Sequence, residues 1–285
     1  MSWLKNVIKR FYPLPASLAR HEIADLKCKL ADLKQELEQS KRKIDQEVLD
    51  SRDEILRNIW FCSRTSKESV WAHVFNNTVA NSSWLVRKSF SPGRWGVGYA
   101  YLYVLYRVLN EVHPRHILDL GLGQTSRMIA QYAAAHPDVE HVVVESSSEW
   151  IAFFQRDFQL PSNSRVIQAD YAIEDYLGKC AVRVFKDLEK KLEGGRFDLV
   201  SIDAPIGGDM KCLSRVDLHR IAPKALADEF VVLMDDTERK PEMDSMIELH
   251  RILLEAGISC SYATYDGMKE CMVLASDSLK YLLTL

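Results

Sequence analysis

Seven short apolar segments that alternate with helical patterns constrain the fold of this chain most strongly. They are His116–Leu120, His141–Glu145, Arg165–Gln168, Phe197–Asp203, Phe230–Met234, Ser259–Thr264 and Cys271–Ala275. Helices are predicted between them over residues 126–135, 149–158, 173–192, 215–227 and 242–256. Apolar strands separated by helices form a parallel sheet that is covered on both faces. The sequence therefore predicts an α/β, Rossmann-like fold with a seven-stranded, mostly parallel sheet.

Two flanking features complete the predicted domain, which we place at residues 94–285. Residues 98–112 are apolar nearly all round, which predicts a buried helix before the first strand. The last two strands are joined only by residues 265–268, a hairpin turn, so we expect one edge strand to run antiparallel.

The chain begins with a basic amphipathic segment, residues 1–18. Apolar residues recur there at helical spacing between lysines and arginines, and no acidic residue precedes Glu22. This pattern is typical of a helix that lies on a membrane surface, although a terminal helix packed on its own domain or on a partner subunit has the same pattern.

Residues 19–60 form a charged, leucine-rich segment without glycine or proline. Apolar residues at alternating spacings of three and four mark the a/d seam of a coiled coil, namely Ile23, Leu26, Leu30, Leu33 and Leu37. We expect a helical stalk that self-associates; the alternative is a long helix lying on the α/β domain. Residues 61–93 are interpreted as a connector with one helix.

Composition excludes several classes of protein. The net charge is −3, which argues against nucleic-acid binding. The six cysteines are scattered and form no CxxC pair, so we expect neither a zinc site nor a disulfide framework. This cysteine pattern suits a reducing, cytoplasmic location, with the basic segment as a peripheral contact to the inner face of the membrane.

The turn after the first predicted strand, HILDLGLGQTSR, is of the kind that binds nucleotides. A dinucleotide-binding G-x-G-x-x-G pattern would have a third glycine at position 126, where this chain has Ser126. Acidic residues follow the next two strands, Glu145 after the second and Asp170 after the third. A carboxylate such as Glu145 can accept both ribose hydroxyls, in NAD and in S-adenosylmethionine alike.

Residues 116–275 resemble the class I S-adenosylmethionine-dependent methyltransferases. The family motif covers Asp119, Gly121 and Gly123 for the methionine end of the donor and Glu145 for its ribose, whereas Thr125 stands where the family often has a third glycine. The resemblance implies S-adenosylmethionine as cofactor. The expected cofactor-binding residues are Asp119, Gly121, Gly123, Gln124, Thr125, Glu145, Ser146, Asp170 and Tyr171.

Within that superfamily, GLGQTSRMIA and VVVESSSEWI resemble the plant glucuronoxylan methyltransferase group, and IDAP and DDTER agree in order and spacing. That group methylates a sugar hydroxyl. The resemblance implies an O-methyltransferase acting on a glycan, free or lipid-linked, such as a bacterial O-antigen. The competing interpretations are an NAD(P)-dependent oxidoreductase and a non-catalytic, membrane-associated scaffold.

Acidic residues also end the fourth and fifth predicted strands. Asp203, Asp235 and Asp236 match the metal triad of catechol-type and macrolide-sugar O-methyltransferases, and their oxygen ligands suit Mg²⁺. Alternatively, Asp203 or Asp236 acts as a general base without a metal. His219, on a predicted helix, is a further candidate base.

Overall fold

The computed structural model describes residues 16–92 and 95–285 and divides the chain into two units, Met1–Phe61 and Cys62–Leu285. Helix α2, Ala16–Val79, continues past the predicted end of the stalk at residue 60, so much of the predicted connector is helical. The basic segment predicted over residues 1–18 lies outside the described residues, apart from its last three. Over the described ranges, no helix has the length and apolarity needed to cross a membrane.

In the first unit, α2 carries the predicted apolar seam on its surface. All five seam residues are exposed, from Ile23 at 53% to Leu37 at 68%. An apolar stripe of this kind on a helix is what one strand of a coiled coil presents before it pairs. Self-association stays a prediction.

The second unit contains a seven-stranded sheet in the order β3-β2-β1-β6-β7-β9-β8. The strands are β1 (His116–Leu120), β2 (Glu140–Glu145), β3 (Ser164–Gln168), β6 (Phe197–Ile202), β7 (Leu226–Asp235), β8 (Cys260–Asp266) and β9 (Glu270–Ser276). The first five strands of the sheet are parallel, and β9 is antiparallel to both β7 and β8. The predicted fold is confirmed, except that the antiparallel strand is inserted second from the edge.

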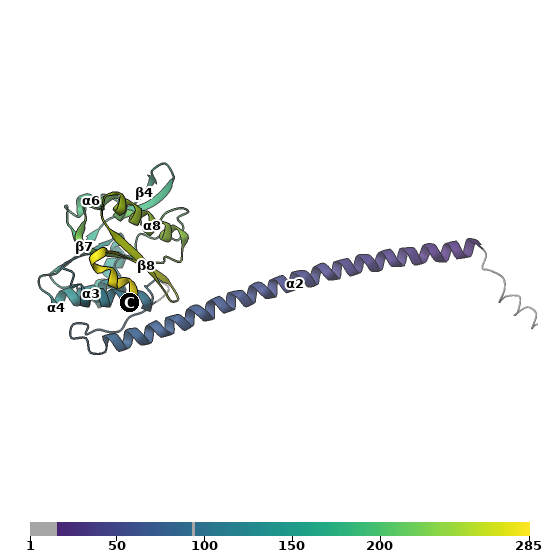
Figure 1. The fold of residues 1–285 in the computed structure, drawn as a ribbon, viewed down its shortest axis with the longest axis horizontal. Helices are drawn as coiled ribbons and strands as arrows, with labels where there is room; N and C mark the ends of the chain where they lie inside the picture. Colours follow the sequence, from purple (N-terminus) through teal and green to yellow (C-terminus); the bar gives the residue numbers. More distant parts are fainter. Residues whose placement is uncertain (1–15, 93–94) are drawn as a thin grey trace, which may run out of the picture. The chain divides into compact units, whose positions relative to one another are not determined.

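Helices cover both faces of this sheet (Figure 1). On one face, α3 (Tyr99–Glu111), α4 (Gln124–Ala135) and the 3₁₀ helix η1 (Asp277–Thr284) pack against the strands, and α5 (Ser148–Asp157) packs beside α4. On the other face lie α7 (Asp217–Ile221) and α8 (Lys240–Glu255). The predicted buried helix is α3, which buries nine of its residues.

The helix predicted over residues 173–192 is wrong. That segment forms a hairpin of β4 (Tyr171–Tyr176) and β5 (Cys180–Phe185), followed by the short helix α6 (Leu188–Lys191). At the tip of this hairpin Leu177 and Gly178 both have positive φ, the Lys179 amide donates to the Tyr176 carbonyl, and Tyr176 pairs with Cys180. The helix predicted over 215–227 is also too long, because α7 ends at Ile221 and β7 begins at Leu226.

The cysteine expectation also needs correction, because Cys180 on β5 and Cys212 in the loop before α7 form a disulfide. A bidentate ion pair between Arg183 and Asp209 joins the same hairpin and loop. The spacing of cysteines along the chain carries no signal for this pairing, because it depends on how the unexpected hairpin folds back.

The last turns of α2 belong to the second unit. Phe75 and Val79 are buried in its core, and the ring of Trp71 lies 5.4 Å from that of Tyr103. Glu68 accepts a hydrogen bond from the Tyr99 amide at the start of α3. This part of α2 is therefore a structural element of the α/β unit.

Candidate active site at the carboxyl ends of the strands

The turn after β1 needs glycine at one of its two family positions. Gly121 has φ +110°, and a Cβ there would stand 3.0 Å from Ala204 Cβ and 3.3 Å from the Asp203 carbonyl carbon. Gly123, in contrast, has an extended φ of −168° and faces open space. The turn thus packs directly on the end of β6 while Gly123 borders an empty region.

Three polar residues of this turn are buried and bond to one another. Asp119 accepts hydrogen bonds from the hydroxyls of Ser126 and, at 3.4 Å, Thr125. The Ser126 hydroxyl in turn accepts from the Gly123 amide at 2.9 Å. Asp119 and Thr125, which we expected to bind the cofactor, therefore shape the loop from inside. Ser126 fills the place where a dinucleotide motif has its third glycine.

Glu145, at the end of β2, ties two loops together. One carboxylate oxygen accepts from the amides of Ser146 and Ser147, and the other accepts from the Leu122 amide at 3.2 Å. The second oxygen thus keeps unused acceptor capacity. Gln124, the remaining predicted residue of this turn, is half-buried and accepts a 3.4 Å hydrogen bond from the Ser91 amide.

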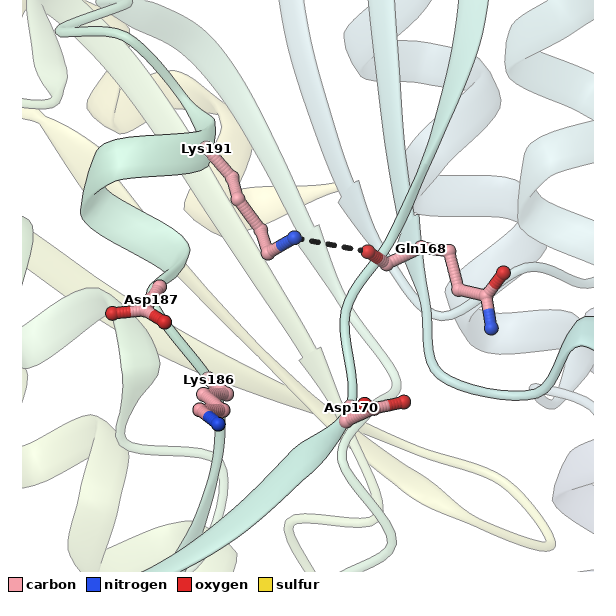
Figure 2. A pocket seen from close by; sticks show the side chains of 5 residues that line it. All are labelled: Gln168, Asp170, Lys186, Asp187 and Lys191. Atoms are coloured by element: carbon pink, nitrogen blue, oxygen red, sulfur yellow. Dashed lines mark hydrogen bonds between the residues drawn. The ribbon is translucent and has the colours of Figure 1, made fainter.

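A polar pocket of about 380 Å³ opens beyond the end of β3 (Figure 2). Its lining residues are Gln168, Asp170, Lys186, Asp187 and Lys191. Gln168 pairs with Glu145 in the sheet, so the pocket adjoins the end of β2. Asp170 is therefore close to where it was expected, whereas Tyr171 packs its ring against Phe185. The pocket does not include the glycine turn or Asp203.

The predicted acidic cluster is present at the ends of β6 and β7. Ligand oxygens of Asp203, Asp235 and Asp236 all lie within 4.8 Å of one another. The Asp203 side chain is 21% exposed, whereas those of Asp235 and Asp236 are almost completely buried. Asp203 is the member of the cluster that solvent or an acceptor can reach.

Three cations face these carboxylates. Lys269 Nζ lies 2.9 Å from Asp235 Oδ2 and 3.0 Å from Asp236 Oδ1. Arg215 Nη2 lies 2.8 Å from Asp236 Oδ2 and 3.3 Å from Asp203 Oδ1. Arg239 Nη2 lies 3.0 Å from Asp236 Oδ1.

These surroundings set different pKa values for the three carboxyls. Burial raises the pKa of Asp203 to about 6, although Arg215 and Lys269 oppose it. Burial, reinforced by the charge of Asp203, raises the pKa of Asp235 to about 8. Burial acts in the same sense on Asp236, but Arg215 and Lys269 outweigh it and hold its pKa below the ordinary value.

The cluster was expected to hold Mg²⁺, and its oxygen chemistry and spacing suit that ion. One further observation favours a ligand, because Asp235 Oδ1 is buried without a hydrogen-bond partner among the described residues. The neighbouring positive charges do not favour a metal ion. Lys269 lies between Asp235 and Asp236, and Arg215 bridges Asp236 and Asp203. In this arrangement the residues do not fit a divalent ion.

His219 does not belong to this site. It is buried on α7, where its Nδ1 accepts from the Tyr176 hydroxyl and its Nε2 donates to the Ser245 carbonyl, both at 2.9 Å. Burial lowers the pKa of His219 to about 4, so the ring is neutral. With both nitrogens engaged, His219 is a structural residue, and we do not retain it as a base.

Sequence reasoning missed Arg215 and Lys269. Arg215 is in an irregular loop with φ +58°, which no pattern indicates. The sequence could have indicated Lys269, because this residue directly follows the predicted hairpin turn, residues 265–268, before β9. Because β9 pairs with β7, with Cys271 opposite Asp235, that turn lies beside the acidic pair.

No family model matches this chain, and no curated protein matches its sequence. Among solved structures, an O-methyltransferase from Bacillus cereus in complex with SAH is 16% identical, covers 74% of this chain and 91% of its own, and has a TM-score of 0.44. A precorrin-6y C5,15-methyltransferase from Geobacter metallireducens is 12% identical, covers 68% and 94%, and has a TM-score of 0.41. At these identities the likeness concerns the fold alone, and the fold follows from this chain's own strand order.

Proposed function

We propose that this protein is an S-adenosylmethionine-dependent O-methyltransferase. The observation that carries the proposal is the packing of the Gly121 turn on the end of β6, which brings a nucleotide-binding loop against Asp203. In α/β sheets of this kind, ligands bind at the carboxyl ends of the strands. The donor loop and a proton-accepting carboxylate are thus adjacent in one site.

The geometry of the loops supports the donor-binding residues that we propose. The open space at Gly123 suits the methionine end of the donor, and the spare oxygen of Glu145 suits a ribose hydroxyl. The pocket that contains Asp170 suits the adenine. When bound, S-adenosylmethionine supplies an electrophilic methyl group on a sulfonium.

Asp203 is our candidate for the general base. Its pKa of about 6 leaves it ionised at neutral pH yet basic enough to accept a hydroxyl proton. Asp236, the other candidate, has its carboxylate engaged by Arg215, Lys269 and Arg239, so we assign it to fixing those cations. We propose no metal-assisted step, because Lys269, Arg215 and Arg239 form ion pairs with the carboxylates of the cluster.

The acceptor we propose is a sugar hydroxyl of a bacterial surface polysaccharide of the O-antigen type. Support comes from the sugar-methyltransferase resemblance of residues 121–130 and 142–151. The basic N-terminal segment and the exposed seam of α2 suit an oligomer that acts on lipid-linked glycans at a membrane surface.

Calorimetry with S-adenosylhomocysteine and with NAD⁺ tests the donor. We expect binding of S-adenosylhomocysteine alone, and at least about tenfold weaker binding by Glu145→Gln, because one ribose acceptor is lost. Glu149→Gln, on the exposed start of α5, is the matched control and should bind as the unaltered protein does. Binding of NAD⁺ without S-adenosylhomocysteine would support the oxidoreductase alternative instead.

A further inference from the structure

The lysine at the acidic cluster is held by contacts that do not involve the cluster. Lys269 follows a turn whose Met268 amide donates to Glu68 Oε2 at 2.8 Å, while Arg64 Nη1 donates to the Met268 carbonyl at 2.8 Å. Gly267 lies so close to Glu68 that a Cβ there would stand 2.2 Å from its carboxylate oxygen. The last turns of α2 therefore fix the backbone from which Lys269 extends.

The arginine at the cluster is likewise held by backbone groups. Arg215 Nη1 donates to the Asp235 carbonyl at 2.9 Å, and Nε donates to the Pro205 carbonyl at 3.3 Å. Its side chain is only 4% exposed. Carbonyls after β6 and at the end of β7 thus orient the guanidinium toward the carboxylates, and it is not a mobile surface charge.

We propose that Lys269 and Arg215 are resident counter-ions of the Asp203–Asp235–Asp236 cluster, and that they take the position a divalent metal ion would need. The inference rests on the proposed methyltransferase function and adds that the acceptor site works without a metal.

Charge and distance support this assignment. The three carboxylates of the cluster face three cations, Lys269, Arg215 and Arg239, so the cluster itself keeps no net negative charge to attract a divalent ion; Glu242, a further buried carboxyl, lies outside the cluster, 3.4 Å from Arg239. Mg²⁺ also requires oxygen ligands at roughly 2.0–2.1 Å in octahedral geometry. An ammonium group 2.9 and 3.0 Å from two of those oxygens leaves no room for such a shell.

A consequence concerns the acceptor. A metal in such a site would gather two acceptor oxygens, which selects substrates with neighbouring hydroxyls. Without the ion, one hydroxyl positioned at Asp203 is sufficient, since Asp203 is the least buried member of the cluster. The site thus favours acceptors with an isolated hydroxyl as readily as those with vicinal ones.

Titration of the full chain with Mn²⁺, followed by the electron paramagnetic resonance of free Mn²⁺, tests the inference. The unaltered protein and Lys269→Arg should show no site up to roughly 1 mM, whereas Lys269→Ala should bind at least about tenfold more tightly because a net negative charge is exposed. Adding Asp203→Asn to Lys269→Ala should abolish that gain. Lys224→Ala, at an exposed lysine, is the matched control and should resemble the unaltered protein.

Two results would overturn the inference. One is Mn²⁺ binding below about 0.1 mM by the unaltered protein that disappears in Asp203→Asn. The other is a folded Lys269→Ala, checked by circular dichroism, that gains no Mn²⁺ site. S-Adenosylhomocysteine binding is measured in the same samples. Its absence contradicts the proposed function, whereas either Mn²⁺ result with donor binding intact contradicts only the metal-free site.

Discussion

Replacing Gly121 with alanine tests whether the turn after β1 is shaped by its backbone, as the structure indicates. At φ +110° a residue with a side chain is strained by about 1–3 kcal/mol. The new Cβ would also stand 3.0 Å from Ala204 Cβ, so β6 or the turn must shift by some tenths of an ångström. We expect Gly121→Ala to lower the free energy of unfolding by about 1–3 kcal/mol.

The same strain appears in donor binding if the turn relaxes locally instead of destabilising the whole unit. A strain of about 1–3 kcal/mol that binding must restore weakens the affinity for S-adenosylhomocysteine by roughly 5- to 150-fold. The strain can divide between a loss of unfolding free energy and a loss of binding free energy. The sum of these two losses should reach at least about 1 kcal/mol.

Gly123→Ala is the matched control, since Gly123 has an extended φ and no heavy atom within 4 Å of an added Cβ. The free energy of unfolding of Gly123→Ala should stay within about 0.5 kcal/mol of that of the unaltered protein. If the donor occupies this open space, the variant should lose only affinity for S-adenosylhomocysteine. Stability is measured by urea unfolding followed by near-ultraviolet circular dichroism, and affinity by calorimetry. Equal stability losses in the two variants, or an unaffected Gly121→Ala, would refute the reasoning.

Three further outcomes are expected. Burial lowers the pKa of His219 to about 4, from about 6.5 in the unfolded chain, so the unfolded chain binds a proton that the folded protein does not. The free energy of unfolding therefore falls as the pH drops through this window. Between pH 7 and 5, His219→Gln should lose about 2 kcal/mol less of this free energy than the unaltered protein does, as measured by urea titrations. Leu30→Glu should lower the oligomeric mass in sedimentation equilibrium, whereas Gln35→Glu, with the same charge change off the seam, should not. Glu68→Gln should weaken the anchoring of the β8–β9 turn and speed amide exchange at Met268, while leaving exchange in β1 unchanged.

The sheet could be predicted because its determinants are local. Each strand is an apolar run of a few residues, and the β1 turn carries Asp119 and both glycines within a dozen positions. Residues 171–185 show the limit of this approach, because their mixed polar pattern fits both a helix and a hairpin. In the structure this segment forms the hairpin, with positive φ at Leu177 and Gly178 and with β4 paired to β5. The Cys180–Cys212 pairing was missed for the same reason, since it exists only once that hairpin has formed.

The acidic cluster illustrates a second limit, which concerns charge. Strand ends place Asp203, Asp235 and Asp236 together, so the sequence finds the carboxylates, and three carboxylates alone favour a metal. Whether the site is negative depends on residues far away in the chain, such as Lys269, whose turn is held by Glu68 at a separation of 200 residues. A motif therefore specifies which ligands meet, whereas the rest of the fold determines their net charge. Under our proposal, the charge of this cluster favours proton transfer at Asp203 over binding of a divalent ion.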